Sequence, residues 1–143
     1  MKILLDFFKN IFKRKTSSNF NDYSNIVAAK VVEFSKHPNA DRLRVVKADI
    51  GNKVIEPIVC GASNFKAGDM VALALPGARI AQNIHSDAHE PFVPGKAKIR
   101  GIESQGMICA AFELGLSKEP GQGVALLKSD IAPGSQFTPE MIQ

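Results

Sequence analysis

The stretch IVAAKVVEFSKHPNADRLRVVKADIGNKVIEPIVC, residues 26–60, decides the fold class. It holds three apolar segments rich in β-branched residues, which are Ile26–Phe34, Leu43–Ile50 and Val54–Cys60. The turn sequences HPNAD (37–41) and GN (51–52) separate them. Runs of β-branched residues bounded by Pro, Gly and Asn predict short strands joined by tight turns.

The rest of the chain continues this pattern of short strands. We expect further strands over four segments, which are Val71–Leu75, Lys96–Gly101, Met107–Ala111 and Val124–Leu127. Residues 81–94 contain two prolines and show no periodicity, which indicates a loop. Six or seven short strands with little helix predict an all-β domain, either a small barrel or a sandwich.

Length and composition indicate one ordinary globular domain. The chain has 143 residues, of which 45% are hydrophobic and 22% charged, and this balance excludes a disordered or collagen-like protein. No apolar run approaches the roughly 18 residues that a membrane-spanning helix needs. Cys60 and Cys109 lie in apolar stretches and are expected to be buried thiols in a reducing compartment, which favours a cytoplasmic location.

The net charge of +4 is concentrated at the N-terminus. Residues 1–15 hold five basic side chains and one acidic, whereas the rest of the chain holds 13 of each. Apolar residues recur there at helical spacing, namely Ile3, Leu4, Phe7, Phe8, Ile11 and Phe12. We therefore predict a basic amphipathic arm and linker over 1–24 and a domain over 25–143. The arm is expected to dock on the domain or to support dimerisation, while membrane binding is disfavoured.

Catalytic signatures are missing from the sequence. It contains no phosphate loop, nucleophile elbow, HExxH or CxxC motif. His85 and His89 flank Asp87 at a spacing that could bind a metal on a helix, but their segment is loop-like and offers no third ligand. We expect neither a metal nor a cofactor, and no catalytic residue.

Two basic segments remain as candidates for binding nucleic acid. Arg42 and Arg44 alternate after the HPNAD turn, and Lys96, Lys98 and Arg100 alternate in KAKIRG. Alternate residues of a strand share a face, so each set could form a phosphate-binding stripe. Charge alone favours an ordinary solvent-facing strand instead. Aromatic residues for base stacking are scarce, so contacts with the shape and phosphates of a folded RNA fit better than single-strand binding.

The segments SKHPNADRLRV, VCGASNFKAGDMVALALPGA and KIRGIESQGMICAAFELGL resemble the tRNA-binding domain of the EMAP-II type. The similarity runs from about Ile26 to Leu127. It is greatest to the N-terminal tRNA-binding domain of the bacterial phenylalanyl-tRNA synthetase β subunit. The resemblance implies an OB-fold, a five-stranded Greek-key barrel, here with an extra C-terminal strand and turns. The loop over 81–94 departs from the shorter loop usual in the family.

The resemblance also implies which residues face tRNA. Arg42, Lys98 and Arg100 would meet phosphates, and Asn39 and Ser104 would donate hydrogen bonds to backbone or sugar. With the remaining residues of the two segments, the full expected RNA-binding set is His37, Asn39, Asp41, Arg42, Arg44, Lys96, Lys98, Arg100 and Ser104.

The sequence therefore predicts a non-enzymatic protein that recognises folded tRNA by backbone and shape contacts. Two alternatives stay open. The chain could be a fragment or reduced form of the phenylalanyl-tRNA synthetase β subunit that acts in assembly of the enzyme, or a module that meets a protein or membrane surface through the arm. The expected partners are tRNA, a second copy of the chain and a synthetase subunit.

Overall fold

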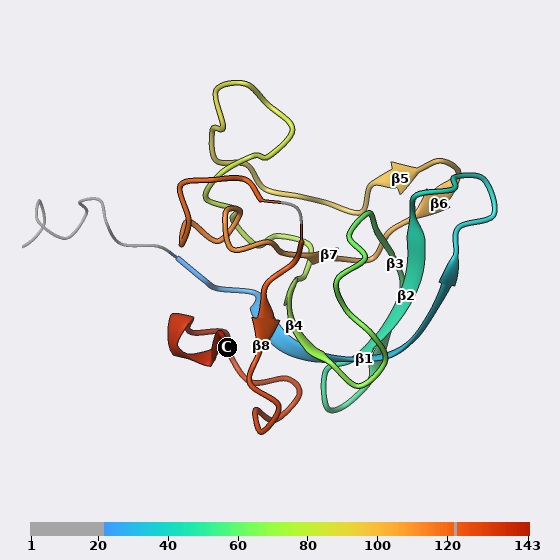
Figure 1. Ribbon diagram of the computed structural model, residues 1–143, viewed down its shortest axis with the longest axis horizontal. Coiled ribbons are helices and arrows are strands. Elements are labelled where there is room, and N and C mark those ends of the chain that lie inside the picture. The colour runs from blue at the N-terminus through green and yellow to red at the C-terminus, as the bar shows by residue number, and fades with distance from the viewer. Residues whose placement is uncertain (1–21, 122) are drawn as a thin grey trace, which may run out of the picture.

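A computed structural model describes residues 22–121 and 123–143 of the chain. Three long strands, β1 (Ile26–Lys36), β2 (Arg44–Asp49) and β3 (Val54–Cys60), form an antiparallel meander (Figure 1). The sheet continues on the other side of β1 with β4 (Met70–Ala74), then β7 (Met107–Ile108), while β8 (Leu126–Leu127) also pairs with β4. The described part of the chain is all-β apart from one turn of 3-10 helix, η1 (Pro139–Met141).

The sheet curls because the two halves of β1 pair with different strands. Its first half pairs with β4 from Ile26 to Lys30, and its second half pairs with β2 up to Lys36. The register shifts between Val31 and Glu33, and a bulge of this kind bends and twists a strand. The open side of the curl is bridged where β3 approaches the segment before β7, since Gln105 N–H donates to the Pro57 carbonyl at 2.9 Å. The result is an OB-like barrel, as expected.

Alternation along the strands divides the buried residues into two clusters. The cluster inside the curl includes Val31, Val46, Ile58, Val71 and Leu73. The second cluster lies on the other face of β4 and the start of β1, where Met70, Ala72 and Ala74 point away from the barrel interior. β4 is therefore buried on both faces, which explains its uninterrupted apolar sequence.

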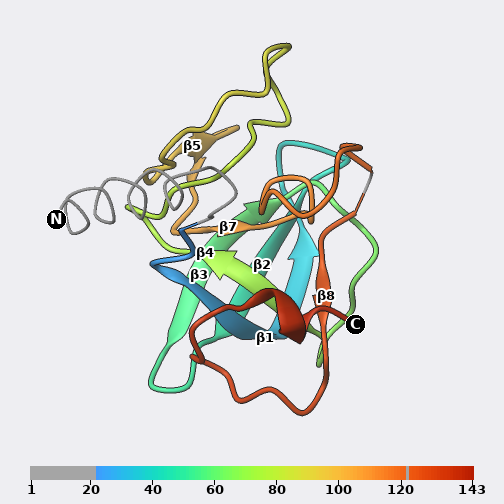
Figure 2. The ribbon, with the colours of Figure 1, turned by 90° about the vertical axis from the view of Figure 1, so that its left-hand side faces the viewer.

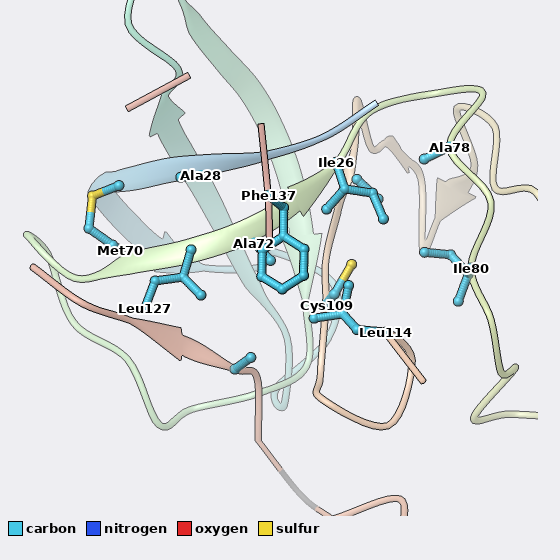
Figure 3. Packing of buried hydrophobic residues seen from close by; sticks show 12 residues of the cluster. Ile26, Ala28, Met70, Ala72, Ala78, Ile80, Cys109, Leu114, Leu127 and Phe137 are labelled. Atoms are coloured by element: carbon cyan, nitrogen blue, oxygen red, sulfur yellow. The ribbon is translucent and has the colours of Figure 1, made fainter. Parts of the chain in front are cut away.

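The C-terminal segment covers this second face. It runs from β8 to η1 across β1 and β4 (Figure 2). Phe137 is 1% exposed and packs among Ile26, Ala72 and Leu127 (Figure 3). The extra C-terminal strand and turns predicted from the sequence are thus part of the core.

The secondary structure differs from the prediction in the Lys96–Gly101 segment. The expected strand over Lys96–Gly101 is wrong, because only β5 (Lys98–Ile99) is extended and it pairs with β6 (Ile102–Glu103) as a separate two-stranded hairpin. Arg100 and Gly101 form its turn, with φ angles of 53° and 91°, as a two-residue type I′ turn requires. The predicted N-terminal helix lies outside the described residues, and within them no helix has the length and apolarity to cross a membrane.

Candidate nucleic-acid interface

Two loops meet at one end of the barrel and carry the predicted RNA-binding residues. One is the β1–β2 loop, residues 37–43, and the other is the β5–β6 hairpin with its flanks, residues 96–104, which Figure 1 shows side by side. We call this region the loop end. Two hydrogen bonds join the loops: His37 Nε2 lies 3.1 Å from the Ile99 carbonyl oxygen, and Asn39 Nδ2 donates to the Arg100 carbonyl at 3.3 Å. Because residues 62 positions apart are tied in this way, the two loops form one surface.

His37 positions the loops and does not face solvent. It is 1% exposed, and its Nδ1 accepts the backbone N–H of Asn39 at 3.0 Å. An accepting Nδ1 places the ring proton on Nε2, which therefore donates to the Ile99 carbonyl. Both ring nitrogens are used inside the protein, so His37 joins the two loops and has no ring nitrogen left for a ligand.

Ser104 has a similar structural position. It is 3% exposed, its hydroxyl donates to the Gly106 carbonyl at 2.8 Å, and it accepts the Val59 N–H at 2.9 Å. The side chain thus bridges β3 and the segment leading to β7, and it helps to close the barrel. Its hydroxyl thus accepts one hydrogen bond and donates another within the protein.

The cations of the hairpin are exposed but do not form the alternating stripe that the sequence suggested. Lys96 lies before β5, Lys98 lies in β5, and Arg100 occupies the turn. Arg100 has a left-handed backbone conformation, which costs an L-residue about 1–2 kcal/mol. The turn places Arg100 at the tip of the hairpin, where its backbone carbonyl accepts the hydrogen bond from Asn39.

Arg42 and Arg44 also differ in environment, because Arg42 lies in the turn before β2 and Arg44 is the first residue of the strand. Arg42 is exposed. The Arg44 guanidinium instead stacks on two rings, 4.0 Å from the centroid of Phe34 and 4.9 Å from that of Phe65. Its Nη1 donates to the Phe65 carbonyl at 2.9 Å. Strand alternation therefore does not relate this pair, because Arg42 precedes the strand, and Arg44 acts mainly as a packing residue.

A groove of about 620 Å³ lies between these two arginines. Its lining includes Lys36, Arg42, Arg44 and Ser63. Asp41 also borders the groove, where it pairs with Lys36 at 3.2 Å. Because Asp41 is matched by Lys36, the two arginines leave the groove with an excess of positive charge.

The outer face of β1, β2 and β3 is less suited to phosphate. Lys47 lies between two carboxylates, 2.9 Å from Glu33 and 3.6 Å from Glu56. The hydrogen bond and charge of Glu33, followed by the charge of Glu56, raise the pKa of Lys47. OB-folds bind oligonucleotides through this sheet face and the adjoining loops. Here two acidic groups flank one basic group on the sheet, whereas the exposed cations Arg42, Lys98 and Arg100 lie on the loops.

The two histidines of the 81–94 loop lie in different environments. His89 packs edge-on against Phe112 with ring centroids 4.9 Å apart, while His85 is exposed. No group of three or more His, Cys, Asp or Glu side chains suitable for a metal occurs among the described residues. The loop itself is tied back by a bridge between Ile80 and Phe92.

Sequence reasoning missed Glu113, a buried carboxylate next to the loop end. It is 8% exposed and accepts the Ala110 N–H at 2.8 Å. Burial raises its pKa, and the Ala110 hydrogen bond and the charge of His85 partly oppose that effect. The available signal was the single acidic residue in the apolar segment AAFELGL.

Comparison with known proteins identifies the family. The family model described as "Putative tRNA binding domain" matches residues 26–136. The chain belongs to the tRNA-binding domain family. The match starts at the first residue of β1 and includes both loops of the loop end, so this tRNA-binding domain contains every residue of the predicted set.

Relatives of this tRNA-binding domain are phenylalanine–tRNA ligase β subunits. The protein from Bdellovibrio bacteriovorus is 40% identical over 116 residues, which is 81% of this chain and 13% of the relative. The protein from Wolinella succinogenes is 47% identical over 106 residues, which is 74% of this chain and 12% of the relative. The chain thus spans about an eighth of the length of these curated relatives. Among solved structures, the C-terminal domain of Plasmodium vivax p43 aligns with a TM-score of 0.49 at 20% identity, covering 80% of this chain and 61% of that one.

Proposed function

We propose that this chain is a non-enzymatic module that binds folded tRNA at the loop end. The main support is that two hydrogen bonds join the β1–β2 loop to the β5–β6 hairpin. Arg42, Lys98 and Arg100 therefore lie together on one solvent-exposed end of the barrel. Lys96 extends the same set along the hairpin flank. The family match supports tRNA binding by this domain, and the excess of acidic groups around Lys47 on the sheet face favours the loops over the sheet as its location.

Binding by such a set is electrostatic. Phosphate contacts position a nucleic acid but carry no sequence information, so the module would recognise the spacing of phosphates on a folded RNA. Each neutralised phosphate releases counterions and steepens the dependence of log K on log salt by roughly 0.7–0.9. Four cations therefore predict a slope of about −3 from the loop end.

The test measures binding of unfractionated folded tRNA to the full chain by fluorescence anisotropy at several salt concentrations. The double variant Lys98→Ala with Arg100→Ala should bind more weakly and show a slope shallower by about 1.5–2. Lys53→Ala is the matched control, since Lys53 is an exposed cation at the opposite, β2–β3 end of the barrel. Equal losses in the control and the double variant, or no loss in either, would place binding elsewhere.

A second candidate function is assembly within a synthetase. It is favoured by the relatives, which are phenylalanine–tRNA ligase β subunits. In that role the module would join a catalytic subunit and act in the cytoplasm, where tRNA is charged. Co-purification of the chain with a phenylalanyl-tRNA synthetase α subunit from the same cell would support this function, and its failure would leave the free tRNA-binding role.

A homodimer would strengthen either function, because two copies bound to one RNA raise the effective concentration of each weak site. Sedimentation of the full chain with and without tRNA measures this directly.

A further inference from the structure

An apolar cavity of about 610 Å³ adjoins the loop end and plays no part in the phosphate contacts. Its walls come from the barrel end, the 81–94 loop and the segment before β8. Much of the lining is apolar side chains, including Val59, Ile84, Phe92, Met107, Ile108 and Val124.

The rim of the cavity is built from the same two loops that carry the cations. Leu43, which lines the cavity, lies between Arg42 and Arg44, and Ile99, which also lines it, lies between Lys98 and Arg100. An RNA backbone held by the exposed cations would therefore pass beside the mouth of the cavity. The local sequence thus places an apolar opening where an unstacked base could turn in.

One charged group sets the polarity of the lining. Glu113 lines the cavity and is 8% exposed. Its carboxylate accepts one hydrogen bond, from the Ala110 N–H at 2.8 Å. An ionised carboxylate only accepts hydrogen bonds and has capacity for about four of them. Buried in apolar surroundings, it gains most from a ligand that offers donors side by side. His85 lines the same cavity from the 81–94 loop.

We propose that this cavity binds an unpaired guanine base of the RNA, with Glu113 reading its Watson–Crick edge. Guanine offers two adjacent donors, N1–H and N2–H, which match a carboxylate in bidentate fashion. Adenine and cytosine each place one donor beside an acceptor, and uracil places one donor between two acceptors. The apolar walls would hold the base by stacking and contact, as pockets for extruded bases do. The proposal rests on the tRNA-binding function and adds base selectivity to it.

Mononucleotides test the cavity separately from tRNA. The full chain is titrated with GMP and AMP, which share the same phosphate, and amide NMR shifts are followed. GMP should bind about tenfold or more tightly than AMP and shift the amides of Ala110 and Ile108, since a bidentate base contact discriminates by that amount or more. Equal affinities, or shifts confined to residues 96–103, would overturn the proposal.

Two variants sharpen the result. Glu113→Gln keeps an oxygen for the Ala110 N–H but loses the paired acceptors, so the GMP preference should disappear. Glu140→Gln, the same substitution at an exposed position in η1, should leave it unchanged. Gly95 lines the cavity, and a Cβ built there meets nothing within 4 Å. Gly95→Phe should therefore fold, as its NMR spectrum will verify, and should weaken GMP and AMP binding alike.

The two proposals fail independently. If tRNA binding keeps its dependence on Lys98 and Arg100 while GMP shows no preference, the guanine site is wrong and the phosphate interface stands. If GMP binds selectively but the double variant leaves tRNA binding intact, the phosphate interface is wrong instead.

Discussion

Replacing Arg100 by glycine should move stability and RNA binding in opposite directions. Arg100 has a φ of 53° at the first turn position of the β5–β6 hairpin, a conformation that costs an L-residue about 1–2 kcal/mol. Glycine adopts it freely, although its greater freedom in the unfolded chain cancels about half of that gain. Arg100→Gly should therefore raise the free energy of unfolding by roughly 0.5–1 kcal/mol, or Tm by a few degrees.

The same substitution removes one phosphate contact. The slope of log K for tRNA against log salt should become shallower by about 0.7–1, with a uniform loss of affinity across tRNA species. Arg100→Ala is the matched control, because it loses the same charge but keeps a side chain in the left-handed conformation. The alanine variant should lose affinity to the same extent without gaining stability.

Urea unfolding and fluorescence anisotropy measure the two effects on the same samples. If Arg100→Gly is no more stable than Arg100→Ala, the turn is not strained by a side chain. If the glycine variant binds tRNA with an unchanged salt slope, Arg100 does not contact phosphate and the reasoning about the hairpin tip fails.

Four further outcomes are expected. Ser104→Ala should cost about 1–3 kcal/mol of unfolding free energy, because it leaves a buried β3 amide without its acceptor, yet the salt slope for tRNA should not change. Burial raises the pKa of Glu113, so ionisation of this carboxyl opposes folding. The protonated carboxyl contributes to stability below the pKa of the unfolded chain, and this contribution is lost as pH rises through the higher pKa of the folded protein. Glu113→Gln should accordingly raise Tm at pH 7 and have a smaller effect at pH 4, and an equal effect at both would contradict this. Burial raises the pKa of the Cys109 thiol well above its ordinary value, so an alkylating reagent at pH 8 should modify it only in denaturant, as mass spectrometry will report. Gly123→Ala should lower Tm, because the new Cβ would lie 2.6 Å from the Asn64 side chain, and a variant with unchanged Tm would show that Asn64 can move without loss.

The sequence predicted the architecture well because strand signals are local. Three β-branched runs, separated by HPNAD and GN, predicted the bounds of β1, β2 and β3 within a few residues. The family resemblance then selected a barrel over a sandwich. β4 was also found, although its burial on both faces depends on a segment more than 50 residues later in the chain. The KAKIRG segment was mispredicted as one strand because its basic and apolar residues alternate as they would in a continuous strand. This alternation does not reveal the turn at Arg100 and Gly101.

The candidate site was predicted only in part, for a related reason. The sequence located the segments, but it could not distinguish exposed cations such as Arg42 from Arg44, whose guanidinium stacks on Phe34 and Phe65. Nor could it show that His37 and Ser104 spend their hydrogen bonds inside the protein. These differences arise from contacts between residues distant in sequence. The contribution of each residue to tRNA binding remains a prediction for the variants above.

The packing of Phe137 has a consequence for how the protein is made. Its N–H donates to the carbonyl of Ile26 at 2.9 Å, so the start of β1 pairs with a segment that is synthesised more than 100 residues later. Contacts of such long sequence separation slow folding, because the loop between them must close first. Until Phe137 emerges, the outer face of β4 is only partly covered on the nascent chain, and a chaperone that shields apolar strands would find its target there.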